Sequence, residues 1–280
     1  MRVHHYIKNI LILCPLFFSR ELYNFFLLRT TIISMFSFCL LSSCVYIFND
    51  MRDLGADRQH SEKKKRPLAS GVISVHNAAV LLAVLLFFSF ALIFLVSENV
   101  VLAVGVSTVY LAMNIVYSLG LKNVPILDIA ILAFGFLLRV IFGSAVTGIE
   151  ISNWLYLTVL SLSFYLGLGK RRNELTRQKG NSRKVLEYYN YNFCDKNMYL
   201  CMALALTFYS LWCIDPITIS NSSGKSLLFT VPIALIILMK YSLNIEGASE
   251  GDPVDVLLSD KILLLLVGIY AVSILSIIYF

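Results

Sequence analysis

Long uninterrupted apolar runs dominate this sequence and leave few folds open to it. Of the 280 residues, 58% are hydrophobic and only 14% are charged, which is far less charge than a soluble chain of this size carries. In lipid the backbone must satisfy its own hydrogen bonds, so a spanning segment is a helix or part of a closed barrel. The runs lack the alternation typical of barrel strands. The sequence therefore predicts an all-α fold, a polytopic membrane helical bundle.

About nine segments have a length near the ~17–25 residues that a transmembrane helix requires. The first, within residues 1–27, begins with basic residues and lacks a small-residue cleavage site after its apolar stretch. We interpret it as a short helix that enters the membrane or lies partly in its interface, and not as a signal peptide. We expect all nine to form a single domain over residues 1–280. The other segments fall at about 28–48, 76–96, 99–118, 126–147, 153–169, 197–213, 227–243 and 261–279.

Lys and Arg residues are concentrated in alternate connections between the predicted helices. In the connections at 97–99, 148–153 and 214–226, the only basic residue is Lys225. Positive charge favours the cytoplasmic side, so we expect an inner (cytoplasmic) membrane protein with its amino terminus inside and its active site facing the cytoplasm. The net charge of +6 then needs no nucleic-acid partner. The cytoplasmic connections carry Arg52, Arg58, Lys63, Lys64, Lys65, Arg66, Lys122, Lys170, Arg171, Arg172, Arg177, Lys179, Arg183 and Lys184.

The stretch from Asn49 to Pro67 mixes acids and bases directly after an apolar segment. If the helix continues, Asp50, Asp53 and Asp57 share one face, because residues at i, i+3 and i+7 align. A divalent cation held by oxygen ligands would offset their mutual repulsion, and the following basic run would bind phosphate. The stretch therefore predicts a site for Mg²⁺ and a diphosphate. The alternative is a solvated loop that only follows the positive-inside bias.

Two ionisable residues, Asp128 and Arg139, lie within the predicted helix 126–147. Their separation of eleven residues is close to three turns, so both can point into one cavity. Charges inside a span usually face a bundle interior or a wet pocket. The alternative is that each residue pairs with a neighbouring helix.

A basic cluster, Lys170-Arg171-Arg172, follows the predicted helix 153–169, with Glu174 as its only nearby acid. Part of this charge is ordinary for a helix end and for membrane orientation. With one acid, the cluster is better suited to an anion than to a second metal. Farther on, Tyr188, Tyr189 and Tyr191 suit a membrane interface at least as well as a ligand. We interpret Asp260, before the last helix, as a partner of the helix dipole.

The pattern Asn49-Asp50-x-x-Asp53-x-x-x-Asp57 after a transmembrane helix, with nine predicted helices, resembles the UbiA-type intramembrane prenyltransferases over nearly the whole chain. In that superfamily a first Asp-rich motif binds Mg²⁺ and a diphosphate, and a second Asp-x-x-x-Asp motif follows the sixth helix. Here Lys170-Arg171-Arg172-Asn173-Glu174 replaces the second motif. This departure argues against transfer of an isoprenyl group to an aromatic acceptor.

The departure resembles one branch of the superfamily, the decaprenyl-phosphate phosphoribosyltransferases. That resemblance implies two substrates, 5-phosphoribosyl diphosphate and a polyprenyl phosphate. The matching blocks occur in the order of that branch. They are Lys8-Asn9 before Pro15-Leu16-Phe17-Phe18, Asp57-Arg58-x-His60-x-x-Lys63-x-x-Arg66-Pro67, Tyr117-Ser118 through Lys122, Asp128 to Arg139, Lys170-Arg171-x-x-Glu174-Leu175, and Asp252-Pro253 with Asp260.

The residue types agree with that chemistry. Loss of diphosphate from the sugar C1 leaves an oxocarbenium-like centre, so the metal-binding acids Asp50, Asp53 and Asp57 would be the catalytic residues. The resemblance also implies inversion at C1. Basic residues would bind the diphosphate, the 5-phosphate and the acceptor phosphate. The predicted substrate-binding residues are Asn49, Arg58, Lys63, Arg66, Tyr117, Lys122, Asp128, Arg139, Lys170, Arg171, Arg172 and Glu174.

Two other functions fit the same features less well. The first is a UbiA-type prenyltransferase that moves an isoprenyl group from its diphosphate to an aromatic or lipid acceptor. The second is a transporter or channel, because polytopic bundles with charges inside the membrane often have that function. The sequence contains no evident inverted repeat and no pair of Gly- or Pro-broken helices, which favours an enzyme.

Overall fold

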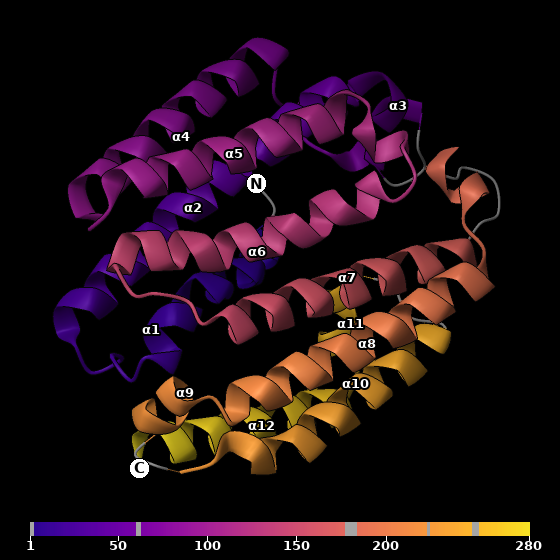
Figure 1. Ribbon diagram of the computed structural model, residues 1–280. Helices are drawn as coiled ribbons and strands as arrows, with labels where there is room; N and C mark the ends of the chain where they lie inside the picture. Colours follow the sequence, from indigo (N-terminus) through magenta and orange to yellow (C-terminus); the bar gives the residue numbers. More distant parts are fainter. Residues whose placement is uncertain (1–2, 60–62, 177–183, 223–224, 248–251) are drawn as a thin grey trace. The chain divides into compact units, whose positions relative to one another are not determined.

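The computed structural model describes residues 3–59, 63–176, 184–222, 225–247 and 252–280, and within them the chain is helical, with no strand (Figure 1). The all-α prediction is confirmed. The helices are η1 (Val3–Leu13), α1 (Cys14–Phe18), α2 (Phe25–Arg52), α3 (Leu54–Gln59), η2 (Lys63–Lys65), α4 (Val75–Val96), α5 (Val100–Leu119), η3 (Leu121–Asn123), α6 (Leu127–Thr147), α7 (Asn153–Thr176), η4 (Lys184–Tyr188), α8 (Tyr191–Cys213), α9 (Pro216–Asn221), η5 (Leu227–Thr230), α10 (Val231–Glu246), α11 (Pro253–Ser259) and α12 (Lys261–Tyr279), where η denotes a 3₁₀ helix.

The chain divides into two compact units. The first comprises residues 1–14, 24–122 and 138–149, and the second comprises residues 15–23, 123–137 and 150–280. The expectation of a single domain over residues 1–280 stays a prediction.

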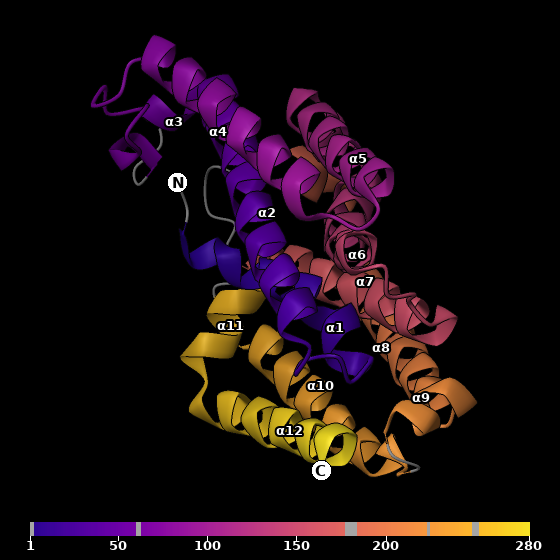
Figure 2. The same ribbon diagram turned by 90° about the vertical axis from the view of Figure 1, so that its left-hand side faces the viewer.

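In the first unit, α2 packs against η1, α4 and α5 (Figures 1 and 2). Its core includes Phe38, Ile93, Tyr110 and Phe142, all buried. Close packing of α2 and α4 depends on two serines. Ser37 Oγ donates to the backbone oxygen of Ser89 at 2.8 Å, and Ser89 Oγ donates to that of Ser37 at 3.0 Å. Small hydroxyl residues of this kind allow helix backbones to approach in lipid.

In the second unit, α7 and α8 form the most extensive helix pair, and α10 packs against α7, α8 and α12. The core around α7 includes Tyr165, Leu168, Met198 and Ile245. Gly167 allows a close approach, because a Cβ atom there would lie 3.0 Å from Cγ2 of Ile129 on α6. The residue at position 167 must therefore remain small unless Ile129 moves.

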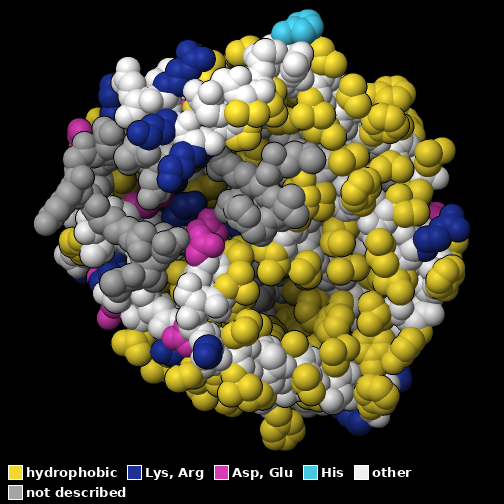
Figure 3. Space-filling view, turned by 180° about the vertical axis from the view of Figure 1, so that it is seen from behind, with side chains coloured by type: hydrophobic (Ala, Val, Ile, Leu, Met, Phe, Trp, Pro, Cys, Tyr) yellow, Lys and Arg dark blue, Asp and Glu magenta, His cyan; other side chains and the backbone are white. Residues whose placement is uncertain are grey.

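Six helices of the described chain are long and apolar enough to cross a membrane: α2, α4, α5, α6, α12 and the continuous segment Leu227–Glu246. Hydrophobic side chains cover much of the surface seen in Figure 3, as expected where helices contact lipid. The number of nine spans is not confirmed. The first predicted helix is mostly 3₁₀, because η1 precedes the short α1.

The structure corrects the prediction that α7 ends near residue 169, since the helix continues to Thr176. The basic cluster at Lys170–Arg172 therefore lies within a helix and not in a loop. No Gly or Pro follows until the helix has ended, and an ion pair between Arg171 and Glu174, at i and i+3, supports the last turn. Of the predicted cytoplasmic charges, Arg177, Lys179 and Arg183 lie outside the described residues.

Replacing Ser37 by Leu should destabilise the protein by about 1–3 kcal/mol, because the larger side chain must fit where α2 and α4 are closest. Thr108→Leu on α5 is the matched control, since Thr108 is exposed. Thermal unfolding in detergent measures both variants. Equal melting temperatures for Ser37→Leu and wild type would contradict this account of the helix pair.

Candidate functional site

The acidic stretch begins inside α2 and continues past its end. Asp50 lies in the last turn of α2, Asp53 is the C-cap, and Asp57 lies in α3. Helical hydrogen bonding continues across the junction, because Asp53 N–H donates to the Asn49 oxygen and Asp57 N–H donates to the Asp53 oxygen, both at 2.9 Å. The three carboxylates therefore come from one nearly continuous helical segment, as the spacing predicted.

Arg66 bridges two of these carboxylates. Its Nη1 donates to Asp50 Oδ1 at 3.1 Å and to Asp57 Oδ2 at 2.6 Å. The Asp57 side chain is 5% exposed, whereas Asp50 and Arg66 are 18% and 25% exposed. Removing a carboxylate from water is costly unless a partner compensates its charge. Arg66, which follows η2, provides that compensation for both acids.

The end of α5 and the following η3 each contact the same segment of α2. Ser118 Oγ donates to Asn49 Oδ1 at 3.2 Å, and Lys122 Nζ donates to Asp53 Oδ1 at 2.7 Å. Ser118 lies in the last turn of α5 and Lys122 lies in η3, after the break at Gly120, whereas Asn49 and Asp53 lie one turn apart at the end of α2. The structure thus brings together two blocks that are far apart in the sequence.

We name the group formed by Asn49, Asp50, Asp53, Asp57, Arg66, Ser118 and Lys122 the acidic cluster. It contains three carboxylates against two cations, so one negative charge remains in excess. Among the described residues, no three acidic, His or Cys side chains are arranged to hold a metal ion as they stand. However, one nitrogen of Arg66 lies within hydrogen-bond distance of both Asp50 and Asp57. These two carboxylates already flank a cation, so the oxygen ligands fit Mg²⁺ if the guanidinium moves away.

The other residues predicted for this region lie nearby in the sequence but are less enclosed. Arg58 in α3 and Lys63 in η2 have exposed side chains, and η2 contacts α3. Tyr117 near the end of α5 is half-buried. His60, part of the motif that resembles the phosphoribosyltransferases, lies outside the described residues.

A second charged centre lies in the second unit around Arg171, whose side chain is fully buried. Its Nε donates to Asp128 Oδ2 at 2.5 Å and its Nη1 donates to Glu174 Oε2 at 2.5 Å. Tyr189 donates to the other Asp128 oxygen at 2.5 Å and accepts from the Ile126 N–H at 2.6 Å. Burial and the Asp128 carboxylate raise the pKa of Tyr189 well above its ordinary value, which keeps its hydroxyl a donor.

The three consecutive cations of α7 have separate partners. Lys170 pairs with Asp252, the N-cap of α11, at 3.3 Å, while Arg172 pairs with Asp195 and lies over the Tyr191 ring. Successive helical residues point about 100° apart, so three neighbours cannot converge on one anion. The structure therefore does not bring Lys170, Arg171 and Arg172 together as one phosphate pocket.

Asp128 and Arg139 are also not brought together. Arg139 belongs to the first unit, where it is buried and its Nε donates to Asn9 Oδ1 at 2.7 Å. Its Nη2 donates to the Tyr110 hydroxyl at 3.2 Å, and the guanidinium lies over the rings of Phe38 and Tyr110. This cationic site is made largely of aromatic faces and an amide, which is typical of a desolvated arginine.

Sequence reasoning missed the roles of Ser118, Tyr189 and Asn9. The sequence left Tyr189 open between the membrane interface and a ligand, and the structure buries it against Asp128. The partners are 61 residues apart, so no local spacing indicates the contact. Asp260 does cap α12, as predicted, and Lys240 at 2.8 Å helps to lower its pKa to about 2.

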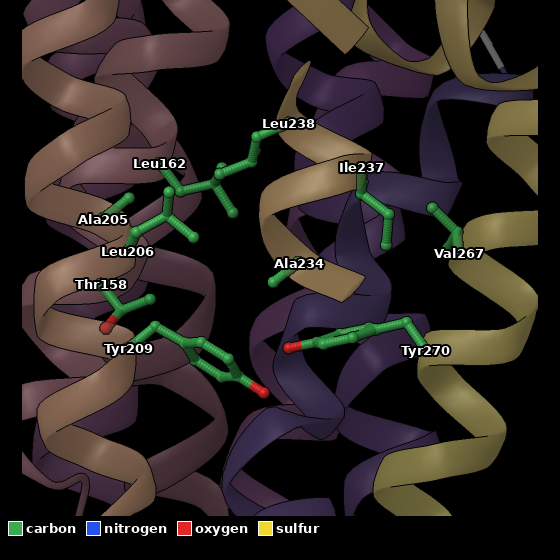
Figure 4. Close-up of a pocket in the computed structure, with 10 residues that line it drawn as sticks. All are labelled: Thr158, Leu162, Ala205, Leu206, Tyr209, Ala234, Ile237, Leu238, Val267 and Tyr270. Carbon is green, nitrogen blue, oxygen red and sulfur yellow. The ribbon is translucent and has the colours of Figure 1, made fainter. Parts of the chain in front are cut away.

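An apolar cavity of about 200 Å³ lies in the second unit, between α7, α8, α10 and α12 (Figure 4). Leucine, isoleucine, valine and alanine side chains line most of it. The hydroxyls of Tyr209 and Tyr270 point toward one another at one end, and their ring centroids are 6.1 Å apart. The lining is suited to a hydrocarbon chain.

Known proteins resemble this chain over most of its length. The UbiA prenyltransferase family matches residues 21–259. A decaprenyl-phosphate phosphoribosyltransferase from Corynebacterium glutamicum is 32% identical over 268 residues, which cover 94% of this chain and 80% of the relative. One from Mycolicibacterium smegmatis is 31% identical, covering 87% and 78%. A UbiA homologue from Archaeoglobus fulgidus, solved bound to GPP and Mg²⁺, has a TM-score of 0.67 at 16% identity, covering 98% of this chain and 100% of that chain.

The helical membrane fold, the charged site and these relatives define the protein as an integral membrane transferase. The chain belongs to the UbiA prenyltransferase family. The predicted resemblance to the family and to its phosphoribosyltransferase branch is confirmed.

Arg171→Met should destabilise the protein by about 3–5 kcal/mol, because it leaves the buried Asp128 carboxylate without its cation. Adding Asp128→Asn should recover part of that loss by removing the uncompensated charge. Lys170→Met is the matched control, and it should cost no more than about 1 kcal/mol because Lys170 is partly exposed. Thermal unfolding measures all three proteins. A single variant Arg171→Met as stable as wild type would exclude this structural role.

Proposed function

We propose that this enzyme transfers 5-phosphoribose from 5-phosphoribosyl diphosphate to a polyprenyl phosphate of the decaprenyl type. The reaction releases diphosphate, depends on Mg²⁺ and takes place at the cytoplasmic face of the inner membrane. The curated relatives named as decaprenyl-phosphate phosphoribosyltransferases support this substrate pair. The observation that carries the proposal is the acidic cluster, in which carboxylates from α2 and α3 meet cations from the segment after η2 and from η3.

The acidic cluster has the two kinds of group that a metal diphosphate requires. Asp50 and Asp57 would hold the metal, with Asp53 as a further oxygen ligand once Lys122 turns away. When bound, Mg²⁺ neutralises charge that develops on the departing diphosphate. Arg66 and Lys122 would bind the diphosphate oxygens, and the exposed Arg58 and Lys63 would attract the anionic donor to this end of α2.

The donor also carries a 5-phosphate, for which the sequence predicts Lys170, Arg171 and Arg172, and this assignment stays a prediction. Within the second unit, Lys170 is 27% exposed and pairs with Asp252 at 3.3 Å, so an anion could replace that partner. Arg171 holds Glu174, whose side chain is 26% exposed. Arg172 pairs with Asp195, and its proposed role is to hold α7 against α8.

The transfer needs no general base, because the acceptor phosphate is already an anion. Its oxygen forms a bond to C1 of the ribose while the bond from C1 to the diphosphate oxygen breaks. The bonding electron pair leaves with the diphosphate. Attack from the face opposite the leaving group inverts C1. The enzyme's contribution is then to hold two anions in line, which is positioning and electrostatic catalysis.

The apolar cavity of the second unit supports a long-chain acceptor. Its walls are almost entirely hydrocarbon, so we assign it to part of the isoprenoid chain. The tyrosine hydroxyls at one end would limit how far the chain enters.

A donor assay tests the proposal against the runner-up. Purified protein is incubated with Mg²⁺, polyprenyl phosphate and 5-phosphoribosyl diphosphate labelled in the ribose, and the lipid phase is counted. We expect label in the lipid. If the protein ignores this donor and instead transfers the isoprenyl group of a prenyl diphosphate, it is a prenyltransferase. If the protein transfers neither phosphoribose nor an isoprenyl group, both enzyme assignments are rejected.

Asp50→Asn and Asp53→Asn should each lower turnover by at least about 100-fold in this assay, since each removes a charge that faces the developing diphosphate. Arg52→Gln is the matched control, because Arg52 is exposed at the end of the same helix. Yield and elution profile verify folding. Near-normal rates in both aspartate variants would remove the acidic cluster from the site.

Ala205→Phe should fill part of the apolar cavity and raise KM for a long-chain polyprenyl phosphate by about tenfold, or ~1.4 kcal/mol of binding energy. A short-chain acceptor that does not reach the cavity should be affected little. Ala271→Phe on the exposed face of α12 is the control. Equal effects on long and short acceptors would reject the assignment of the cavity to the chain.

A further inference from the structure

Arg66 lies between the two carboxylates that the proposed function assigns to the metal. A single nitrogen, Nη1, donates to carboxylates of both Asp50 and Asp57, at 3.1 and 2.6 Å. An ion that bridged these same two oxygens would lie where Nη1 lies, and two cations this close repel each other. Arg66 is thus an internal counter-ion that competes with the metal.

Displacement of Arg66 has an electrostatic cost. The guanidinium is only 25% exposed, and arginine keeps its charge at every accessible pH. Without the two carboxylates it would need another anion. Phosphate oxygens fit the planar guanidinium fork particularly well. A diphosphate that arrives with the metal provides such a partner at the moment the carboxylates are taken.

Resting on the proposed function, we infer that Arg66 couples metal binding to diphosphate binding. Without a diphosphate, Arg66 holds Asp50 and Asp57 and weakens their affinity for the metal. With a diphosphate, Arg66 exchanges the carboxylates for phosphate oxygens and the metal binds tightly. Because linkage is reciprocal, the metal strengthens diphosphate binding by the same factor. The enzyme therefore takes up metal together with its donor.

The other lysines near the acidic cluster differ from Arg66. Lys64 and Lys65 are exposed in η2, so water screens their charge. Within the part of the chain that the structure describes, Lys122 pairs with Asp53 at 2.7 Å.

Metal binding can be measured without catalysis. The detergent-purified full chain is titrated with Mn²⁺, and the electron paramagnetic resonance signal of free Mn²⁺ gives its affinity. Titrations are run with and without methylenediphosphonate, a diphosphate analogue that cannot be cleaved, and protein-free titrations correct for its own Mn²⁺ binding. Arg66→Gln and Arg66→Met both remove the charge of Arg66. If one of these variants does not fold, the other still tests the proposal. Arg52→Gln is the matched control.

We expect the analogue to increase the Mn²⁺ affinity of wild type and Arg52→Gln by at least about tenfold, a coupling of ~1.4 kcal/mol. Arg66→Gln and Arg66→Met should bind Mn²⁺ alone about tenfold more tightly than wild type, and the analogue should then add less than about threefold. If both variants bind Mn²⁺ alone no more tightly than wild type, or retain the full effect of the analogue, the coupling role is wrong.

A separate variant tests whether the metal binds at these acids at all. Asp50→Asn combined with Asp57→Asn should remove Mn²⁺ binding with and without the analogue. If this double variant binds Mn²⁺ as wild type does, the metal assignment of the proposed function fails as well. Loss of binding in the double variant with unchanged behaviour in both Arg66 variants overturns the coupling alone.

Discussion

Carboxylates removed from water must be compensated by charge, and both charged centres of this protein are organised by that requirement. In a low-dielectric surrounding an uncompensated carboxylate costs several kcal/mol, more than most packing contacts contribute. Asp57 meets the requirement through Arg66, and Asp128 meets it through Arg171 and Tyr189. The segments that carry Arg66, Arg171 and Tyr189 must therefore pack against the helices that carry Asp57 and Asp128.

The same requirement distinguishes cations that can bind a ligand from cations that only stabilise the fold. Arg171 and Asp128 are fully buried and compensate each other, so their charge is used within the protein. Arg66, Lys122 and Lys170 are each about a quarter exposed and can exchange one anion for another.

Hydrophobic length made most of the fold predictable. The predicted helices at 76–96, 99–118 and 126–147 differ from α4, α5 and α6 by at most one residue at each end. The prediction failed at the charged end of α7, which continues for seven residues beyond the apolar run. The ion pair between Arg171 and Glu174 stabilises this extension, and composition does not reveal such a contact. In the site, the spacing of Asp50, Asp53 and Asp57 indicated the acidic cluster. The contact of Lys122 with Asp53 spans 69 residues and has no local signal.

The contact between Asp128 and its partners has a consequence for biosynthesis. Arg171 and Tyr189 follow Asp128 by 43 and 61 residues, so they leave the ribosome on the order of seconds later. Until then the nascent α6 carries a carboxyl group without its cation, which opposes its burial in lipid. Ile126, just before α6, has a φ of 68°, and its N–H is held by Tyr189. The entry to α6 is therefore completed late in translation, when the Tyr189 segment arrives.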